Sequence, residues 1–465
     1  MGRDKPELLK AFMQQLPDGA MLKLTAAVEM DKASGGEGLP HEMLLEALRP
    51  RLRNGSAKAP RIAAPLRLVC EPFEDMLIDG PRRSKQPGRI LRATLAPMWK
   101  WLRDGSAALV DLEKDVQKKV KGGDALALAT AAAALRAETA AAIRARLGKL
   151  EEGGKSWRAL EVLLGGTGAI DDVREIALLL EVAPQFMELR ATLPSHITRL
   201  SEEQLRSIRG SFDKLPESNP AQAPYLPLLV LGRLERPWEA LRLTGAVSRQ
   251  VVDTMVQQTD MGMIGDVLFA DLETEAEAVR AVNPHDYDPA AIVAHIASFV
   301  RFSGGLTKEL GIRKDGKWGQ RLLRSRSLIG ETIEALLAKA PKDIQAALPT
   351  HRMGGFGAKG PRRPDVTRPP DAEKSARARR VLTLLSTARP HATQAAFTAA
   401  ANDVFDEVCS GLRLYNQEIV NELRAASPET KANVEAYLAL AAELTEIVMG
   451  EQESGQLRRR AAAGR

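Results

Sequence analysis

Apolar side chains recur at every third or fourth position along most of the chain. This spacing gathers them on one face of a helix, whereas a half-buried strand would alternate apolar and polar residues. Strict alternation bounded by turn residues is hard to find in the sequence. The pattern therefore predicts an all-α fold, with an irregular multi-helix N-terminal region and a C-terminal antiparallel helical bundle.

Residues that cap helices mark several of the predicted elements. Gly122 and Gly123 end one periodic stretch, and the next begins at once, so residues 104–148 predict a helical hairpin. Short polar side chains at a helix start accept hydrogen bonds from the free amides there, and proline suits the first helical position. Four helix starts carry this signal: Asp124, Ser201 with Gln204 in a capping-box spacing, Asp288 with Pro289, and Ser427 with Pro428.

The chain is expected to divide into five parts. Residues 351–373 are rich in Gly, Pro and Arg and poor in apolar side chains, so they predict a flexible linker. After it, the three-four apolar spacing predicts helices that pack antiparallel, as in a coiled coil. The predicted parts are a helical segment (1–78), a main helical region (79–350), the linker (351–373), a helical bundle (374–450) and a basic disordered tail (451–465).

Composition supports this helical prediction. Aromatic residues are only 4% of the chain, and Ala and Leu supply much of the apolar content. Ala and Leu lose little entropy in a helix, whereas aromatic and β-branched residues favour strands. Hydrophobic residues make up 44% of the 465 positions, enough for a sizeable core. The net charge of +6 permits an anionic partner without requiring one.

The sequence also indicates a compartment. Cys70 and Cys409 stand in no CxxC or Cys/His spacing, which argues against a disulfide framework or a structural zinc site and indicates reducing surroundings. The N-terminus carries no apolar secretory stretch. The most apolar runs, 125–135 and 225–231, are shorter than the roughly 20 residues of a membrane span. We expect a cytoplasmic protein without a transmembrane segment.

Several stretches approach chemical motifs without completing them. Residues 148–157 resemble a phosphate-binding loop, but Lys149 stands where the first glycine is required, so a helix stop followed by a Ser-capped helix is favoured. Residues 41–45 begin like a zinc-protease helix, but Leu45 replaces the second histidine. At 165–172 a glycine-rich joint precedes Asp171 and Asp172, which favours an ordinary helix cap over an anion site.

A metal site is the alternative interpretation of residues 283–289. His285, Asp286 and Asp288 lie close together there, and His295 follows two turns into the next helix. A loop followed by a helix cap explains most of the same residues, and no second ligand cluster matches this one. We therefore predict no catalytic residue, no metal site and no cofactor. A catalytic pair built from distant acids stays open, because spacing along the chain does not reveal one.

Residues 82–103 are the most unusual stretch, with seven Arg or Lys, two Trp and no Asp or Glu. If residues 89–103 form a helix, one face carries Leu91, Leu95, Met98 and Leu102 and the cations lie opposite, with a kink or a new helix start at Pro97. Three interpretations compete. The apolar face packs in the core, or the helix lies on an anionic membrane surface, or its basic face follows nucleic acid phosphates.

The predicted function is that of a non-enzymatic helical scaffold or adaptor that binds a protein partner. It follows from amphipathic helices, flexible joints and the absence of a catalytic motif, since fold alone does not set function. The alternative is binding to an anionic surface, nucleic acid or the membrane periphery, through residues 82–103 and 359–380. The residues proposed to bind such a partner are Arg82, Arg83, Lys85, Arg89, Arg92, Trp99, Lys100, Trp101, Arg103, Arg362, Arg363, Arg368, Arg377, Arg379 and Arg380.

Overall fold

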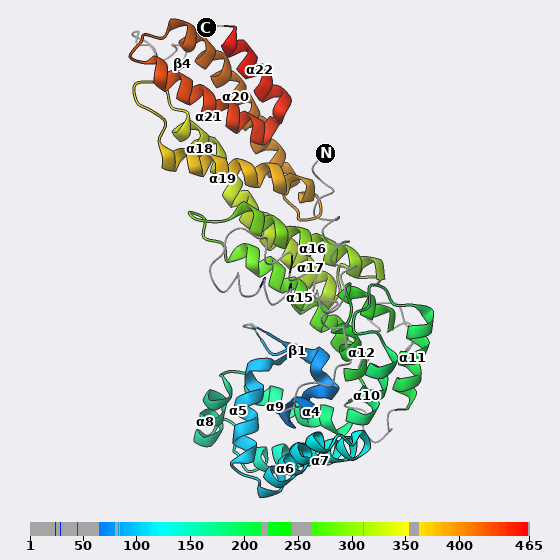
Figure 1. Ribbon diagram of the computed structural model, residues 1–465. Helices are drawn as coiled ribbons and strands as arrows, with labels where there is room; N and C mark the ends of the chain where they lie inside the picture. The colour runs from blue at the N-terminus through cyan, green and yellow to red at the C-terminus, as the bar shows by residue number, and fades with distance from the viewer. Residues whose placement is uncertain are drawn as a thin grey trace. The chain divides into compact units, whose positions relative to one another are not determined.

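A computed structural model confirms the all-α fold (Figure 1). The only strands among the described residues are four short ones of two or three residues each. The structure describes residues 24, 28, 44, 65–79, 82, 84–214, 222–243, 262–309, 311–352 and 362–463. Most of the predicted N-terminal segment, including residues 41–43 and 45, lies outside the described residues.

The chain forms two compact units, which are treated separately below. The first comprises residues 1–250 with 258–264, and the second comprises residues 251–257 with 265–465. The predicted linker at 351–373 therefore lies inside the second unit and does not separate two units.

The first unit is built almost entirely of helices. Its described elements are α4 (Pro65–Cys70), η1 (Glu71–Met76), β1 (Leu77–Ile78), β2 (Ile90–Leu91), α5 (Arg92–Arg103), α6 (Ala107–Gly122), α7 (Ala125–Leu147), α8 (Lys155–Leu164), α9 (Ala169–Glu181), α10 (Ala183–Thr192), α11 (Glu202–Asp213), α12 (Tyr225–Leu231) and η3 (Pro237–Ala240).

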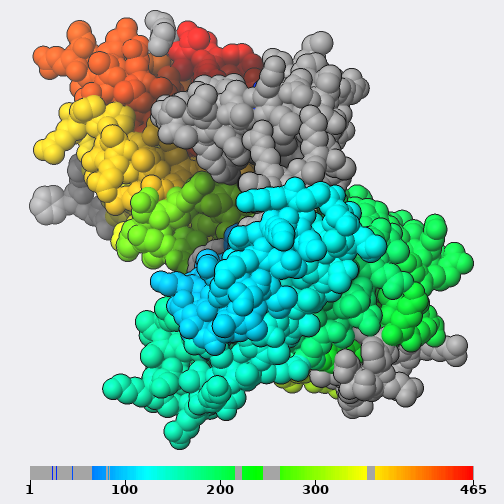
Figure 2. All heavy atoms as spheres, turned by 60° about the horizontal axis from the view of Figure 1, so that its bottom comes forward, coloured from blue at the N-terminus to red at the C-terminus, as the bar shows by residue number. Residues whose placement is uncertain are grey.

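The helical hairpin predicted at 104–148 is confirmed as α6 and α7, which pack against each other. Gly123 ends α6 in the left-handed conformation, with φ 72°, which a residue without Cβ adopts at little cost. Asp124 then accepts hydrogen bonds from the amides of Leu126 and Ala127 at 3.0 Å each. Figure 2 shows the two helices, in cyan, at the surface of the first unit.

The helix predicted over 89–103 differs from the structure at its start and at Pro97. Ile90 and Leu91 form β2, which pairs in parallel with β1, and the helix begins only at Arg92. Helix α5 continues through Pro97, so no new helix starts there. Leu95, Met98 and Leu102 are buried, which confirms the face assigned to the core at these three positions, whereas Leu91 lies in β2 and is half-buried.

The second unit contains the longest helix of the described chain. Its elements are α15 (Gly262–Arg280, which begins at the division between the units), α16 (Pro289–Glu309), α17 (Lys317–Leu337), α18 (Ala340–Ala347), β3 (Thr350–Arg352), β4 (Arg362–Pro364), α19 (Ala372–Ala388), η4 (Arg389–His391), α20 (Thr398–Ala425), α21 (Lys431–Met449) and α22 (Glu451–Ala462).

Helices α19, α20 and α21 form the core of this unit's C-terminal half (Figure 1). The apolar stripes predicted for α20 and α21 are buried at most of their positions, which include Val408, Leu412, Tyr415, Ile419, Leu423, Val434, Tyr437, Ala441 and Leu444. Two other predicted helix starts are also found: Ser201 and Gln204 form a complete capping box on α11, and Asp288 accepts from the amide of Ala290 at the start of α16. The start predicted at Ser427 and Pro428 is wrong, because α21 begins at Lys431 with Thr430 as its N-cap.

The prediction of a flexible linker is wrong at both described ends of residues 351–373. Strands β3 and β4 pair antiparallel, with Thr350 opposite Pro364, and β4 packs on α20. Farther on, the Asn433 side chain donates to the carbonyl oxygen of Val366 at 3.0 Å. Pro364 is buried, so contacts with distant helices order a stretch whose own composition is poor in apolar residues.

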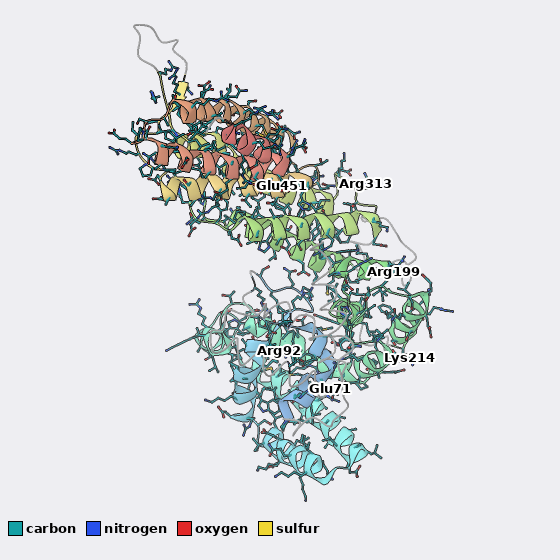
Figure 3. All side chains as sticks on the ribbon, turned by 45° about the horizontal axis from the view of Figure 1, so that its top comes forward. Glu71, Arg92, Arg199, Lys214, Arg313 and Glu451 are labelled. Carbon is teal, nitrogen blue, oxygen red and sulfur yellow. The ribbon has the colours of Figure 1, made fainter. Side chains whose placement is uncertain are left out.

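The prediction of a disordered tail from residue 451 is also wrong. Helix α22 begins at Glu451 (labelled in Figure 3) and packs against α21. Leu457 and Ala461 lie one turn apart and are buried, and Arg458 pairs with Glu446 at 2.7 Å. The many charged residues of this segment hid a narrow apolar stripe, which is enough to hold a short helix on a neighbour.

Two helices, α7 and α16, have the length and mean hydropathy of a membrane span, with values of 1.4 and 1.3 over their most apolar windows. Core helices of soluble proteins pass the same test. Helix α7 packs against α6 and α9, and α16 packs against α19. The absence of a transmembrane segment stays a prediction.

Candidate functional site

The first half of the basic segment forms a buried ionic cluster in the first unit, made of Arg82, Lys85, Asp172 and Glu175. The two acids lie three residues apart on α9, so they share one face. Arg82 Nη1 lies 2.6 Å from Asp172 Oδ1, and Lys85 Nζ lies 3.0 Å from the same oxygen. Lys85 also pairs with Glu175. The side chain of Asp172 is fully buried, and that of Arg82 is only 9% exposed.

Backbone groups complete the cluster. Arg82 donates to the carbonyl oxygens of Arg89 (3.0 Å) and Gly168 (2.8 Å). The amide of Gly88 donates to Glu175 Oε1 at 2.8 Å. Gly88 has φ 67°, and a Cβ at this position would lie 2.9 Å from Leu228, so glycine is needed for the turn. The cluster therefore fixes the path of residues 82–89 against α9.

This arrangement changes the roles expected of three predicted residues. Arg82 and Lys85 were candidates for binding an anionic partner, but they lie inside the unit and neutralise Asp172 and Glu175. The glycine-rich joint at 165–172 is a helix cap, as predicted, with Gly168 as the N-cap of α9 and Asp171 and Asp172 in its first turn. Asp172 has the further role of pairing with the buried cations. Charges this deeply buried are tolerated only when they are paired and hydrogen-bonded.

The cations of α5 lie closer to solvent. Arg92 (labelled in Figure 3) pairs with Glu74 at 3.0 Å and with Asp79 at 3.2 Å. Arg103 pairs with Glu113 at 2.8 Å. Lys100 is exposed. The predicted binding surface is therefore largely neutralised by acids that lie elsewhere in the sequence.

The aromatic residues of α5 and the remaining cations of the segment differ in their surroundings. Trp99 is buried in the core. Trp101 is half-buried, and the guanidinium of Arg146 lies over its ring, 4.4 Å from the centroid. Arg89 is half-buried, and Arg83 lies outside the described residues. Neither tryptophan is placed as an exposed membrane anchor would be.

The second predicted basic segment belongs to the other unit and is also paired with acids. Arg379 makes a two-pronged contact with Glu443, at 2.7 and 2.8 Å. The other pairs are Arg363 with Glu422 (3.7 Å), Arg377 with Glu373 (3.4 Å) and Arg380 with Asp286 (3.2 Å). Arg362 and Arg368 are exposed.

The described residues contain no group of three or more His, Cys, Asp or Glu placed to hold a metal. At 283–289, Asp286 pairs with Arg380. His295 instead pairs with Glu275 at 2.7 Å, and Ser298 donates to the other oxygen of the same carboxylate at 2.9 Å. A nucleophilic triad would need serine bonded to histidine, so this trio lacks that geometry.

The remaining motif residues have structural surroundings. Helix α8 begins at Lys155 with Gly154 as its N-cap, so the predicted Ser-capped start is wrong. Cys70 and Cys409 are free and buried. Burial raises the pKa of the Cys70 thiol to about 12, with Glu74 adding to the effect, so this thiol stays protonated and unreactive at neutral pH.

The second unit carries an apolar groove, a feature that the sequence pattern did not reveal. Its volume is about 480 Å³, within the range of ligand and side-chain binding pockets. Helices α18 and α20 form its walls, and β3 and β4 contribute one residue and two residues. The lining residues are Pro341, Ile344, Gln345, Leu348, Thr350, Arg362, Pro364, Glu407, Val408, Gly411, Leu412, Leu414, Tyr415 and Glu418.

One stripe of α20 forms an edge of the groove: Glu407, Gly411, Leu414 and Glu418. The spacing of four, three and four residues places them along one line of the helix. Leu414 is 65% exposed, although it stands beside the buried Leu412 and Tyr415. A Cβ at Gly411 would meet nothing within 4 Å, so this glycine leaves a notch beside Leu414.

One residue that lines the groove, Tyr415, has a polar atom without a partner. The Tyr415 hydroxyl is buried and has no hydrogen-bond partner among the described residues. Burial raises the pKa of Tyr415, and Tyr437 and Asp365 add to this effect, so the phenol stays neutral. The charged residues that line the groove are Glu407, Glu418 and Arg362. Glu407 and Arg362 are exposed and Glu418 is half-buried, so these charges form the solvent-facing rim.

A sequence signal for the groove exists at two positions. Leu414 is apolar but lies off the core stripe that runs through Leu412 and Tyr415. Gly411 sits in the interior of a long helix, where glycine costs about 1 kcal/mol relative to alanine. The opposite wall, α18, comes from more than 60 residues earlier, and no local pattern pairs it with α20.

Comparisons with known proteins place no constraint on this site. No protein-family model, no curated protein and no solved structure matches the chain.

Proposed function

We propose that this protein is a non-enzymatic adaptor that binds a protein partner through the groove between α18 and α20. The observation that carries the proposal is Leu414, a leucine 65% exposed at the edge of an apolar groove. Large apolar side chains beside such a groove are typical of surfaces that a partner covers.

The lining residues favour a role in binding over a role in catalysis. Ile344, Leu348 and Leu412 offer apolar surface, and the buried phenol of Tyr415 is neutral. Burial of apolar area contributes about 25 cal/mol per Å², so a partner side chain seated here gains affinity without a reacting group. Bound partners commonly depend on a few such anchors near the centre of an interface.

The alternative function, binding to an anionic surface, has weaker support. Its residues in 82–103 are largely engaged with acids of the same unit, and Arg82 and Lys85 are buried. Exchanging these two residues for glutamate would disrupt the fold and so cannot test binding. Exposed cations such as Lys100, Arg362 and Arg368 are the proper positions for that test.

A matched pair of substitutions tests the adaptor proposal. Tagged full-length chain carrying Leu414→Asp is compared with Leu323→Asp, which changes a leucine 45% exposed on α17 and absent from the groove. Each protein is used to capture partners from its native host. We expect a stoichiometric partner to bind the wild type and the Leu323 variant and to be lost from the Leu414 variant.

The folded state of both variants is checked by circular dichroism and urea denaturation, and we expect little change for either exposed position. Photo-crosslinking from a photoreactive residue introduced in place of Gln345 should then join the same partner to the groove. Equal capture by both variants, or crosslinks that avoid α18 and α20, would refute the adaptor role assigned to this groove.

A further inference from the structure

We infer that the partner segment is an amphipathic helix that carries basic side chains about three turns apart along the edge facing α20 and an acidic side chain along the edge facing β4. The inference rests on the proposed function and specifies the chemistry of the partner. It follows from the shape of the groove and from the charges at its rim.

The shape favours a helix. The groove walls are side chains of α18 and α20, the setting in which an amphipathic helix lays apolar anchors at i, i+3 or i+4 and i+7. Leu414 forms a ridge, and the notch at Gly411 lies one turn before it. Because Gly411 has no side chain, a partner backbone can approach α20 closely at that point.

The charges at the groove rim determine the sign and the spacing of the charges expected on the partner. Glu407 and Glu418 stand eleven residues apart on the stripe of α20, so at a rise of 1.5 Å per residue they are separated by roughly 16 Å. Neither carboxylate has an ion-pair partner among the described residues. A helix with Lys or Arg eleven positions apart matches this separation in either direction along the groove.

The opposite rim carries the opposite charge. Arg362 of β4 lines the groove and is exposed, while its neighbour Arg363 is paired with Glu422. A partner helix with a uniformly basic surface would meet repulsion at Arg362. Charges arranged in this way contribute more to the choice of partner and its orientation than to overall affinity.

Two synthetic peptides of 18 residues test the inference against the full-length chain. Both carry the same Leu stripe at i, i+4, i+7 and i+11. Both also carry one glutamate on the far edge of the helix, which is the edge intended to face β4; the near edge is the one intended to face α20. One has Lys at two positions eleven residues apart on the near edge, and the other has Glu there. Fluorescence anisotropy should show the Lys peptide binding about tenfold more tightly, a ratio that falls with added salt.

Three variants locate the effect. Glu407→Lys with Glu418→Lys should invert the peptide preference, because the variant's lysines repel the Lys peptide and attract the Glu peptide. Glu331→Lys with Glu334→Lys, a reversal of equal charge at exposed positions of α17, should leave the preference unchanged. Gly411→Leu should abolish binding of both peptides, since its side chain fills the notch while meeting no atom of the fold within 4 Å of its Cβ.

The inference is overturned if the wild type binds both peptides equally, if it does not bind the Lys peptide, or if the α20 reversal leaves the preference intact. The outcomes that would overturn this inference can be distinguished from those that would overturn the adaptor proposal. If the native partner is lost with Leu414→Asp but tolerates the α20 reversal, the groove binds a partner of another chemistry. If Leu414→Asp leaves capture unchanged, the groove is not the adaptor surface.

Discussion

The two basic segments of this protein, 82–103 and 359–380, are both rich in Arg and Lys but have different structural roles. In the first unit, Arg82 and Lys85 are buried and meet Asp172 and Glu175, about 90 residues farther along the chain. In the second unit, Arg379 and its neighbours remain near the surface, and their acidic partners are also solvated.

The difference shows that cation content does not indicate what a segment binds. Removing one partner of a buried ion pair leaves an uncompensated charge and costs several kcal/mol, whereas a solvated pair contributes about 1 kcal/mol or less. The ion pairs of the first segment therefore contribute to the stability of its unit. Those of the second segment lie on the surface of a helical bundle that apolar contacts stabilise, and they contribute little. Each prediction below tests this contrast.

The largest effect is expected for Asp172→Asn. Loss of this carboxylate leaves Arg82 without its anionic partner in the interior, so the free energy of unfolding should fall by about 3–5 kcal/mol. Urea denaturation followed by tryptophan fluorescence measures it, because four of the five tryptophans, Trp99, Trp101, Trp157 and Trp238, belong to the first unit. The neighbouring Asp171→Asn, half exposed, is the control and should change little.

A smaller loss is expected for Glu175→Gln. Lys85 keeps Asp172 as a partner at 3.0 Å, and the glutamine oxygen can still accept from the amide of Gly88. The free energy of unfolding should fall by about 1–3 kcal/mol in the same urea experiment. A loss as large as that of Asp172→Asn would show that the two acids do not differ in importance.

In the second unit, the Arg379–Glu443 pair should contribute little. Both side chains are over 40% exposed, so solvent screens their attraction. A double-mutant cycle with Arg379→Ala and Glu443→Ala should give a coupling energy of about 0.5–1 kcal/mol, measured by thermal or urea unfolding followed by circular dichroism. A coupling of 3 kcal/mol would remove the contrast between the two segments.

The smallest effect is expected for Lys100→Glu. Lys100 lies in the first segment but is exposed, so reversing its charge should change the free energy of unfolding by no more than about 0.5 kcal/mol. Gel-shift and liposome sedimentation at low salt then test anionic binding on a folded protein. Strong binding by the wild type that Lys100→Glu with Arg368→Glu removes would favour the alternative function.

Local patterns predicted the helical fold well because helix formation depends on neighbours three and four residues apart. The stops and caps at Gly123, Asp124 and Ser201 act within one turn, and each is found where the sequence places it. The buried faces of α5, α20 and α21 also follow from spacing alone.

The errors arise where distant segments supply the missing contacts. Residues 351–373 are poor in apolar side chains, but β3 and β4 form hydrogen bonds with each other and β4 packs on α20. Residues 451–462 look like a charged tail, but Leu457 and Ala461 are enough to hold α22 on α21. The composition of a segment describes its own side chains. It does not show which distant residues will contact them in the folded chain.

The sequence by itself determined the type of secondary structure, most helix ends and the apolar faces, because these depend on side chains within a turn of one another. The tertiary structure alone decided that Arg82 and Lys85 face acids of α9, and that α18 stands beside α20 to form a groove. Such contacts join residues many positions apart. Their formation depends on the path of the whole chain, which no local pattern records.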